Sequence, residues 1–251
     1  MKQAFVLLAS LSLVVITSCR DTPTAPSSSQ IYGQTSGQPL PNIDNLGEIG
    51  GLFGTYLTKQ TVGRDRELAT AQFEADGLDG GIVGVNNFTL SKQLVGGTLL
   101  YTSAGGVNAT NDIPDVDFDG STHQFYAEGN NGVPEIDVSV ESATDFELQQ
   151  PTVFDVVNKA DNLDVVWTGG SGTSDERVLI IISSQGTNNA SVTKDIPNTG
   201  SYSFRANDLN DISGSVVFTL IKYRMATDVV QGKTYVALSE IIYQRSITIV
   251  E

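Results

Sequence analysis

The chain has 251 residues, with 29 acidic against 14 basic side chains and a formal charge of −15. A field of that sign repels phosphate backbones and anionic lipid heads, so it excludes nucleic acid as a partner and membrane attachment through a basic patch. The hydrophobic content of 39% is enough for packed cores, and the length fits two small domains better than one large one.

The first 18 residues have the layout of a secretory signal peptide. Lys2 gives a positive start, an apolar run extends from Ala4 to Ile16, and the small residues Thr17 and Ser18 precede Cys19. The run of about 13 apolar residues is shorter than the roughly 17 to 25 that a spanning helix needs. We therefore expect a cleaved leader rather than a transmembrane anchor.

Residues 16–19, Ile-Thr-Ser-Cys, resemble the bacterial lipobox, in which an aliphatic and two small residues precede a cysteine. The resemblance implies that Cys19, the only cysteine, carries diacylglycerol and a further acyl chain such as palmitate. Two or three chains, at about 0.8 kcal/mol per buried CH₂, hold a protein at a membrane. A lipoprotein of the cell envelope is expected. Because Arg20 stands where the enteric inner-membrane signal has aspartate, the outer membrane is favoured.

After the cysteine, the stretch from Arg20 to Leu40 is rich in serine, threonine and proline and has few large apolar side chains. Such a composition does not bury enough surface to offset the entropy of ordering, and it predicts a flexible tether. We assign residues 19–46 to the lipidated cysteine and this linker.

From residue 48 onward, short apolar alternations bounded by Gly, Asn, Asp and Ser recur about every 10 residues, without a sustained helical period. The pattern predicts an all-β chain. Strands are expected near residues 69–74, 81–90, 98–102, 123–128, 136–141, 152–156, 163–168, 177–183, 201–205, 216–223 and 234–250. Pro151 suggests a boundary, because proline cannot donate to a strand ladder. It would separate a β-rich domain, residues 47–150, from a second one, residues 151–251.

Two segments of the second half carry a resemblance. Residues 163–167, Leu-Asp-Val-Val-Trp, and residues 198–204, Asn-Thr-Gly-Ser-Tyr-Ser-Phe, are similar to strands of immunoglobulin-like and fibronectin type III domains in exported bacterial proteins. The resemblance implies an immunoglobulin-like β-sandwich for residues 151–251. In its last strand, Ile241, Tyr243, Ile247 and Ile249 share one face, which we expect to be buried.

The sequence contains few candidates for catalysis. His123 is the only histidine, which excludes a histidine-rich zinc site, and no Gly-x-Ser-x-Gly elbow accompanies it. We expect His123 to be solvent-facing or hydrogen-bonded. No phosphate-binding glycine loop occurs. A pair of carboxylates stays open as a hydrolytic site, because 29 acids allow many pairings.

One loop suggests a metal ion. Asp115, Asp117 and Asp119 alternate and are followed by Gly120, the spacing with which carboxylates converge on calcium. The twelfth position of such a loop is Tyr126 rather than glutamate, and strands are expected on both sides. A solvated acidic loop is the alternative, and no other cofactor is expected.

We therefore expect a non-catalytic binding or structural module of the cell envelope, held to the membrane by its N-terminal lipid. Its protein or glycan partner is not specified by the sequence. One alternative is an accessory glycan-binding lipoprotein; another is a carboxylate-dependent hydrolase. Aromatic side chains on the expected strands would form either the core or a stacking platform for sugars: Tyr101, Phe125, Tyr126, Trp167, Tyr202, Phe204 and Tyr243.

Overall fold

The computed structural model describes residues 32–33, 36–105, 110–172, 175–185 and 190–251. Most of these residues belong to strands, which confirms the all-β class. Within the same ranges, no helix has the length and apolar character needed to cross a membrane. Cys19 and the expected signal peptide lie outside the described residues.

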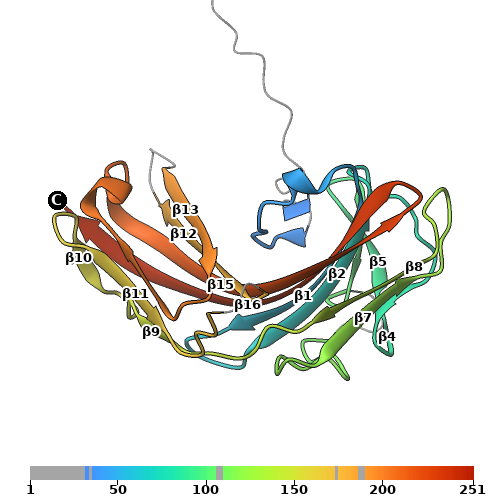
Figure 1. Cartoon of the computed structure of the whole chain (residues 1–251), viewed down its shortest axis with the longest axis horizontal. Helices are drawn as coiled ribbons and strands as arrows, with labels where there is room; N and C mark the ends of the chain where they lie inside the picture. The colour runs from blue at the N-terminus through green and yellow to red at the C-terminus, as the bar shows by residue number, and fades with distance from the viewer. Residues whose placement is uncertain (1–31, 34–35, 106–109, 173–174, 186–189) are drawn as a thin grey trace, which may run out of the picture.

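A curved sheet of nine strands runs along the molecule (Figure 1). Its strand order is β13-β12-β15-β16-β1-β2-β6-β5, and β10 pairs with the far end of β16. Only β1 and β10 run parallel to β16; the other neighbours are antiparallel. The strands are β1 (Ile49–Lys59), β2 (Arg66–Phe73), β5 (Ser91–Val95), β6 (Thr98–Thr102), β10 (Val156–Asn158), β12 (Arg177–Ser184), β13 (Ser191–Pro197), β15 (Gly214–Val230) and β16 (Lys233–Val250).

The hairpin of β15 and β16 connects the two ends of this sheet. The two strands pair from Gly214 opposite Ile249 to Val230 opposite Lys233. On its other edge, β16 pairs with β1 up to Tyr243 and with β10 from Thr248. Strands from both sides of residue 150 therefore share one sheet. The division into two domains stays a prediction, and the main sheet crosses its proposed boundary.

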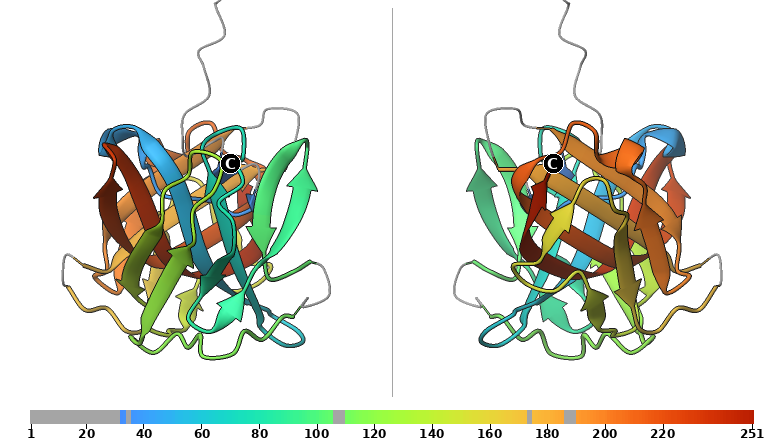
Figure 2. Two further views of the ribbon diagram at one scale, coloured as in Figure 1. Left: turned by 90° about the vertical axis from the view of Figure 1, so that its right-hand side faces the viewer. Right: turned by 90° about the vertical axis from the view of Figure 1, so that its left-hand side faces the viewer.

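Two smaller sheets cover the convex face at opposite ends of the molecule (Figures 1 and 2). One has the order β4-β3-β7-β8 and the other β14-β11-β9. Their strands are β3 (Val83–Val85), β4 (Phe88–Thr89), β7 (Thr122–Ala127), β8 (Ile136–Glu141), β9 (Leu148–Gln150), β11 (Leu163–Trp167) and β14 (Ser201–Phe204). The larger hydrophobic core includes Phe53 and Ile241 of the main sheet, Phe125 of β7 and Trp167 of β11.

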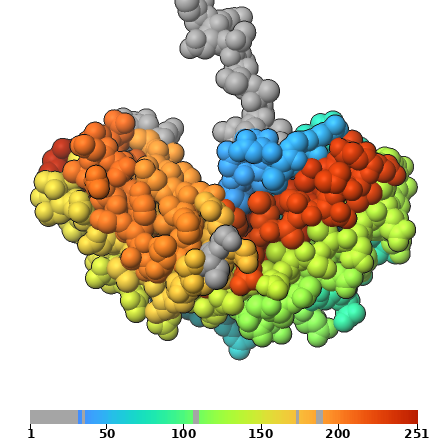
Figure 3. All heavy atoms as spheres, in the orientation of Figure 1, coloured from blue at the N-terminus to red at the C-terminus, as the bar shows by residue number. Residues whose placement is uncertain are grey.

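The N-terminal segment, residues 36–46, packs on the concave face (Figures 1 and 3). Ile43 is fully buried, and Leu40 and Leu46 are partly buried, against a cluster that includes Leu52 of β1 and Leu238 of β16. The predicted linker, residues 19–46, therefore includes a part that packs against the sheet. The segment has few apolar residues, but those residues cover a sheet face that would otherwise be exposed to solvent.

Strand β16 confirms the expected buried face, because Ile241, Ile247 and Ile249 are each at most 1% exposed and Tyr243 packs against the same core. The predicted strand at residues 152–156 is wrong. That segment is largely a turn between β9 and β10, in which the carboxylate of Asp155 accepts from the backbone N–H of Thr152, and only its last residue, Val156, belongs to a strand.

Candidate functional site

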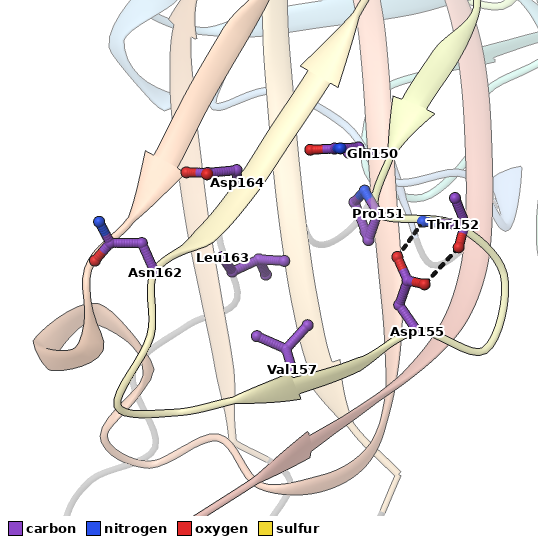
Figure 4. Close-up of a pocket in the computed structure, with 8 residues that line it drawn as sticks. All are labelled: Gln150, Pro151, Thr152, Asp155, Val157, Asn162, Leu163 and Asp164. Atoms are coloured by element: carbon purple, nitrogen blue, oxygen red, sulfur yellow. Dashed lines mark hydrogen bonds between the residues drawn. The ribbon is translucent and has the colours of Figure 1, made fainter.

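The residues around Pro151 form an open pocket between β9, β10 and β11, with a volume of about 400 Å³ (Figure 4). It lies in the half of the molecule covered by the three-stranded sheet. Eight residues line it: Gln150, Pro151, Thr152, Asp155, Val157, Asn162, Leu163 and Asp164. We call it the β9–β11 pocket.

Its two carboxylates have different roles. Asp155 accepts hydrogen bonds from both the backbone N–H and the Oγ1 hydroxyl of Thr152, each at 2.5 Å, so it holds the turn that leads into β10. Asp164 points outward from β11, where its neighbours Leu163 and Val165 are buried. Asp164 is therefore the carboxylate that is free to meet a ligand.

The remaining wall is partly apolar and partly polar. Pro151, Val157 and Leu163 supply apolar surface, while Gln150 and Asn162 supply amides that both donate and accept hydrogen bonds (Figure 4). No basic side chain is among the lining residues. The nearby guanidinium of Arg245 is bonded to the backbone carbonyls of Pro151 and Leu148. An anionic ligand would therefore meet two carboxylates, whereas a neutral ligand with hydroxyl groups finds both donors and acceptors.

An exposed aromatic residue belongs to the same turn. The side chain of Phe154 is 78% exposed, and its backbone has φ +66°, a left-handed conformation that is unusual for a bulky residue. Its N–H donates to the carbonyl of Ser246 at 2.8 Å, which fixes the turn against β16. Sequence reasoning did not identify Phe154, because nothing in its neighbours shows which side of the chain faces solvent.

The aromatic residues expected from the sequence form no exposed platform. Tyr101, Phe125, Trp167 and Phe204 are at most 3% exposed, and Tyr202 packs against the same core. These five are core residues, one of the two roles expected for them, whereas Tyr126 is only partly buried.

His123 is buried and hydrogen-bonded. Its Nε2 lies 2.9 Å from the carbonyl oxygen of Asp117, which can only accept, so Nε2 carries the proton. Nδ1 then accepts from the Oγ1 hydroxyl of Thr55 at 2.8 Å. Burial lowers the pKa of His123 and favours the neutral ring. The hydrogen-bonded role expected from the sequence is confirmed.

The aspartates of the predicted calcium loop have separate contacts. Asp115 accepts from Asn87 at 3.1 Å through its carboxylate, and Asp119 accepts from the backbone N–H of Ser121 at 2.9 Å. Asp117 contributes its backbone carbonyl to His123. Among the residues that the structure describes, no group of three or more His, Cys, Asp or Glu side chains is placed to hold a metal ion. Calcium binding at this loop stays a prediction of the sequence.

No protein-family model matches the chain, and no curated protein matches it. Its function is therefore inferred from residues and geometry.

Proposed function

We propose that this protein is a lipid-anchored component of the cell envelope that binds a neutral, polyhydroxylated ligand, a glycan, in the β9–β11 pocket without transforming it. The observation that carries the proposal is the lining of that pocket, which combines amides, a free carboxylate and apolar surface with no basic side chain. Sugars are bound by groups of this kind, and an exposed aromatic ring adds a surface for stacking.

Binding fits this pocket better than hydrolysis does. A hydrolase of the two-carboxylate type needs one carboxyl group as an acid and the other as a base or nucleophile. Both carboxylate oxygens of Asp155 accept hydrogen bonds from Thr152, so Asp155 is not available as an acid, base or nucleophile. Asp164 therefore has no second catalytic carboxylate in this pocket.

Two finer expectations belong to the same proposal. We propose an immunoglobulin-like sandwich for residues 151–251, supported by the antiparallel pairing of β11 with β14, the two segments that carry the resemblance, in which Trp167 and Phe204 are buried. We also propose that lipid on Cys19 attaches the protein to the outer membrane, supported by the resemblance of residues 16–19 to a lipobox and by Arg20 directly after the cysteine.

The test is calorimetric titration of the full chain, purified in detergent, with maltohexaose, cellohexaose, xylohexaose and mannohexaose. We expect at least one neutral hexasaccharide to bind. Asp164→Ala and Phe154→Ala should each weaken it about tenfold or more, because one removes a hydrogen-bonding carboxylate and the other a stacking ring.

Asp211→Ala is the matched control, since Asp211 is exposed and lies outside the pocket. The proposal fails if no neutral glycan binds, if polygalacturonate binds more tightly than the neutral hexasaccharides, or if Asp164→Ala and Phe154→Ala both bind like the control.

A further inference from the structure

A second hollow lies where β1 and β2 are joined. Two adjoining cavities of about 430 and 170 Å³ share Arg66, Glu67 and Asn111 as lining residues. The larger one, which we call the hairpin pocket, is lined by Leu57, Arg64, Asp65, Arg66, Glu67, Asn111 and Asp112. None of these residues belongs to the β9–β11 pocket.

Two arginines of the hairpin pocket have no carboxylate partner. Arg64 and Arg66 are exposed, and neither takes part in an ion pair within the described part of the chain. Ion pairs engage Lys59, Lys92, Lys159, Arg177, Lys194, Lys222, Arg224 and Lys233. Arg205 and Arg245 form none with the described residues either, but they stand apart from each other in the chain, and Arg245 donates to backbone carbonyls. Guanidinium groups pair readily with carboxylates, and this chain has 29 acidic residues. Two neighbouring arginines without such a partner can therefore bind the oxyanion of a ligand.

The acidic residues of the hairpin pocket do not neutralise these arginines. Asp65 pairs with Lys59 at 3.0 Å. Glu67 accepts the backbone N–H of Ile113 at 2.7 Å. Asp112 is exposed and forms no ion pair with any described residue. The pocket thus holds free groups of both signs that are not bonded to each other.

The unpaired groups of the two signs come from different segments of the chain, because Asp65 and Glu67, which alternate with the arginines, are bonded to other partners. Arg64 and Arg66 lie at the end of the β1–β2 turn and the start of β2, whereas Asp112 lies in the loop that follows β6. A backbone hydrogen bond of 3.1 Å from Glu67 to Asn111 joins the two segments. One wall can therefore meet an anion while the other meets a cation.

We propose that the hairpin pocket binds a zwitterion, a ligand that carries one carboxylate and one ammonium group, such as a short peptide with free ends. The carboxylate lies on Arg64 and Arg66, and the ammonium group lies on Asp112. A simple anion would meet the unpaired Asp112, and a simple cation would meet two guanidinium groups. Only a ligand with both charges satisfies both walls. This site is independent of the glycan proposal.

The experiment uses three probes that differ only at their ends: L-alanyl-L-alanine, its N-acetyl derivative and its C-terminal amide. Each is titrated into the full chain in detergent by calorimetry. We expect the free dipeptide to bind at least about tenfold more tightly than either blocked form, which corresponds to about 1.4 kcal/mol. Added salt should weaken this binding, since the pocket is open to solvent.

Substitutions assign each end to its wall. The double variant Arg64→Gln and Arg66→Gln should abolish the preference for the free dipeptide over the amide, because the carboxylate then has no guanidinium partner. Asp112→Asn should lower the affinity for the free dipeptide to that of the N-acetyl form. Arg205→Gln removes one charge outside both pockets and should bind normally. Thermal melting of each variant verifies the fold.

Three results would overturn the zwitterion site: no binding of the free dipeptide, equal binding of a blocked form, or variants that bind like Arg205→Gln. Asp164→Ala should keep full dipeptide affinity, so failure of the glycan proposal is distinguishable from failure of this one.

Discussion

Glu240 lies on the concave face of β16 among apolar side chains. It is fully buried, and neither carboxylate oxygen has a hydrogen-bond partner within the described residues. Its neighbours across the strands are Tyr56 of β1 and Tyr223 of β15, which face it as neutral phenols. Burial in this environment raises the pKa of Glu240 well above its ordinary value of 4.5.

The raised pKa of Glu240 determines how the free energy of unfolding changes with pH. Above pH 4.5 the unfolded chain releases the proton of Glu240 while the folded chain keeps it, so the free energy of unfolding falls as pH rises. Glu240→Gln should remove this slope and make the protein more stable than the parent at neutral pH. Urea denaturation at a series of pH values measures the difference.

Glu147→Gln serves as the comparison, because Glu147 is exposed. His123 has the opposite effect on stability below pH 6.5. Because its pKa is lowered in the folded chain, the unfolded chain binds the proton more readily, and the free energy of unfolding rises with pH. The difference between parent and variant isolates Glu240. An unchanged slope in Glu240→Gln would contradict the assignment.

At the scale of elements, a buried polar network joins the three-stranded sheet to the main sheet. Glu176, 1% exposed and just before β12, accepts from Asn198 at 2.6 Å and lies 3.4 Å from Nζ of the fully buried Lys222 on β15. Asn198 also accepts from the indole of Trp167 at 2.7 Å. Burial opposes the charge of Glu176, but the N–H of Thr144 and the charge of Lys222 outweigh it and lower the pKa of Glu176.

Breaking this network should cost much of the protein's stability. Glu176→Gln keeps the shape but leaves Lys222 buried without its counter-charge, and we expect a loss of about 3–5 kcal/mol in the free energy of unfolding. Combining it with Lys222→Met should restore part of that loss, because the fully buried ammonium group is then gone and Arg224, the other cation beside Glu176, keeps its ion pair with Glu141. Chemical denaturation of both variants measures the two values. A double variant less stable than Glu176→Gln would refute this account.

The position of β1 shows why one central element was not predicted. Residues 49–57 are buried throughout, because β1 lies between β16 and β2 and is covered on both faces, so its sequence has no alternation. Its glycines also obscure the strand. A side chain at Gly54 would sit 2.2 Å from the hydroxyl oxygen of Tyr56, so the absence of a Cβ lets that ring lie along the strand.

At the scale of the whole molecule, the proposed lipid anchor has a direct test. Cys19→Ala should leave the precursor without lipid and move the protein from the detergent-rich to the aqueous phase in Triton X-114 partitioning, because the acyl chains supply the membrane affinity. Ser18→Ala is the control, since it keeps the cysteine and a small residue before it. A Cys19→Ala protein that stays in the detergent-rich phase would refute the anchor.

The amino-acid sequence determined the all-β class, the strands at residues 98–102 and 136–141, and the buried face of β16. It could do so because alternation with a period of two reports which side of a strand avoids water. The tertiary structure alone decided that β1 pairs with β16 and that residues 36–46 cover the concave face.

The two pockets also could not be predicted from the sequence. The β9–β11 pocket brings Gln150, Asp155 and Asp164 together, and the hairpin pocket brings Arg66 next to Asp112. Strand pairing and loop packing join residues that are distant in the chain, and no local pattern encodes which partners will meet.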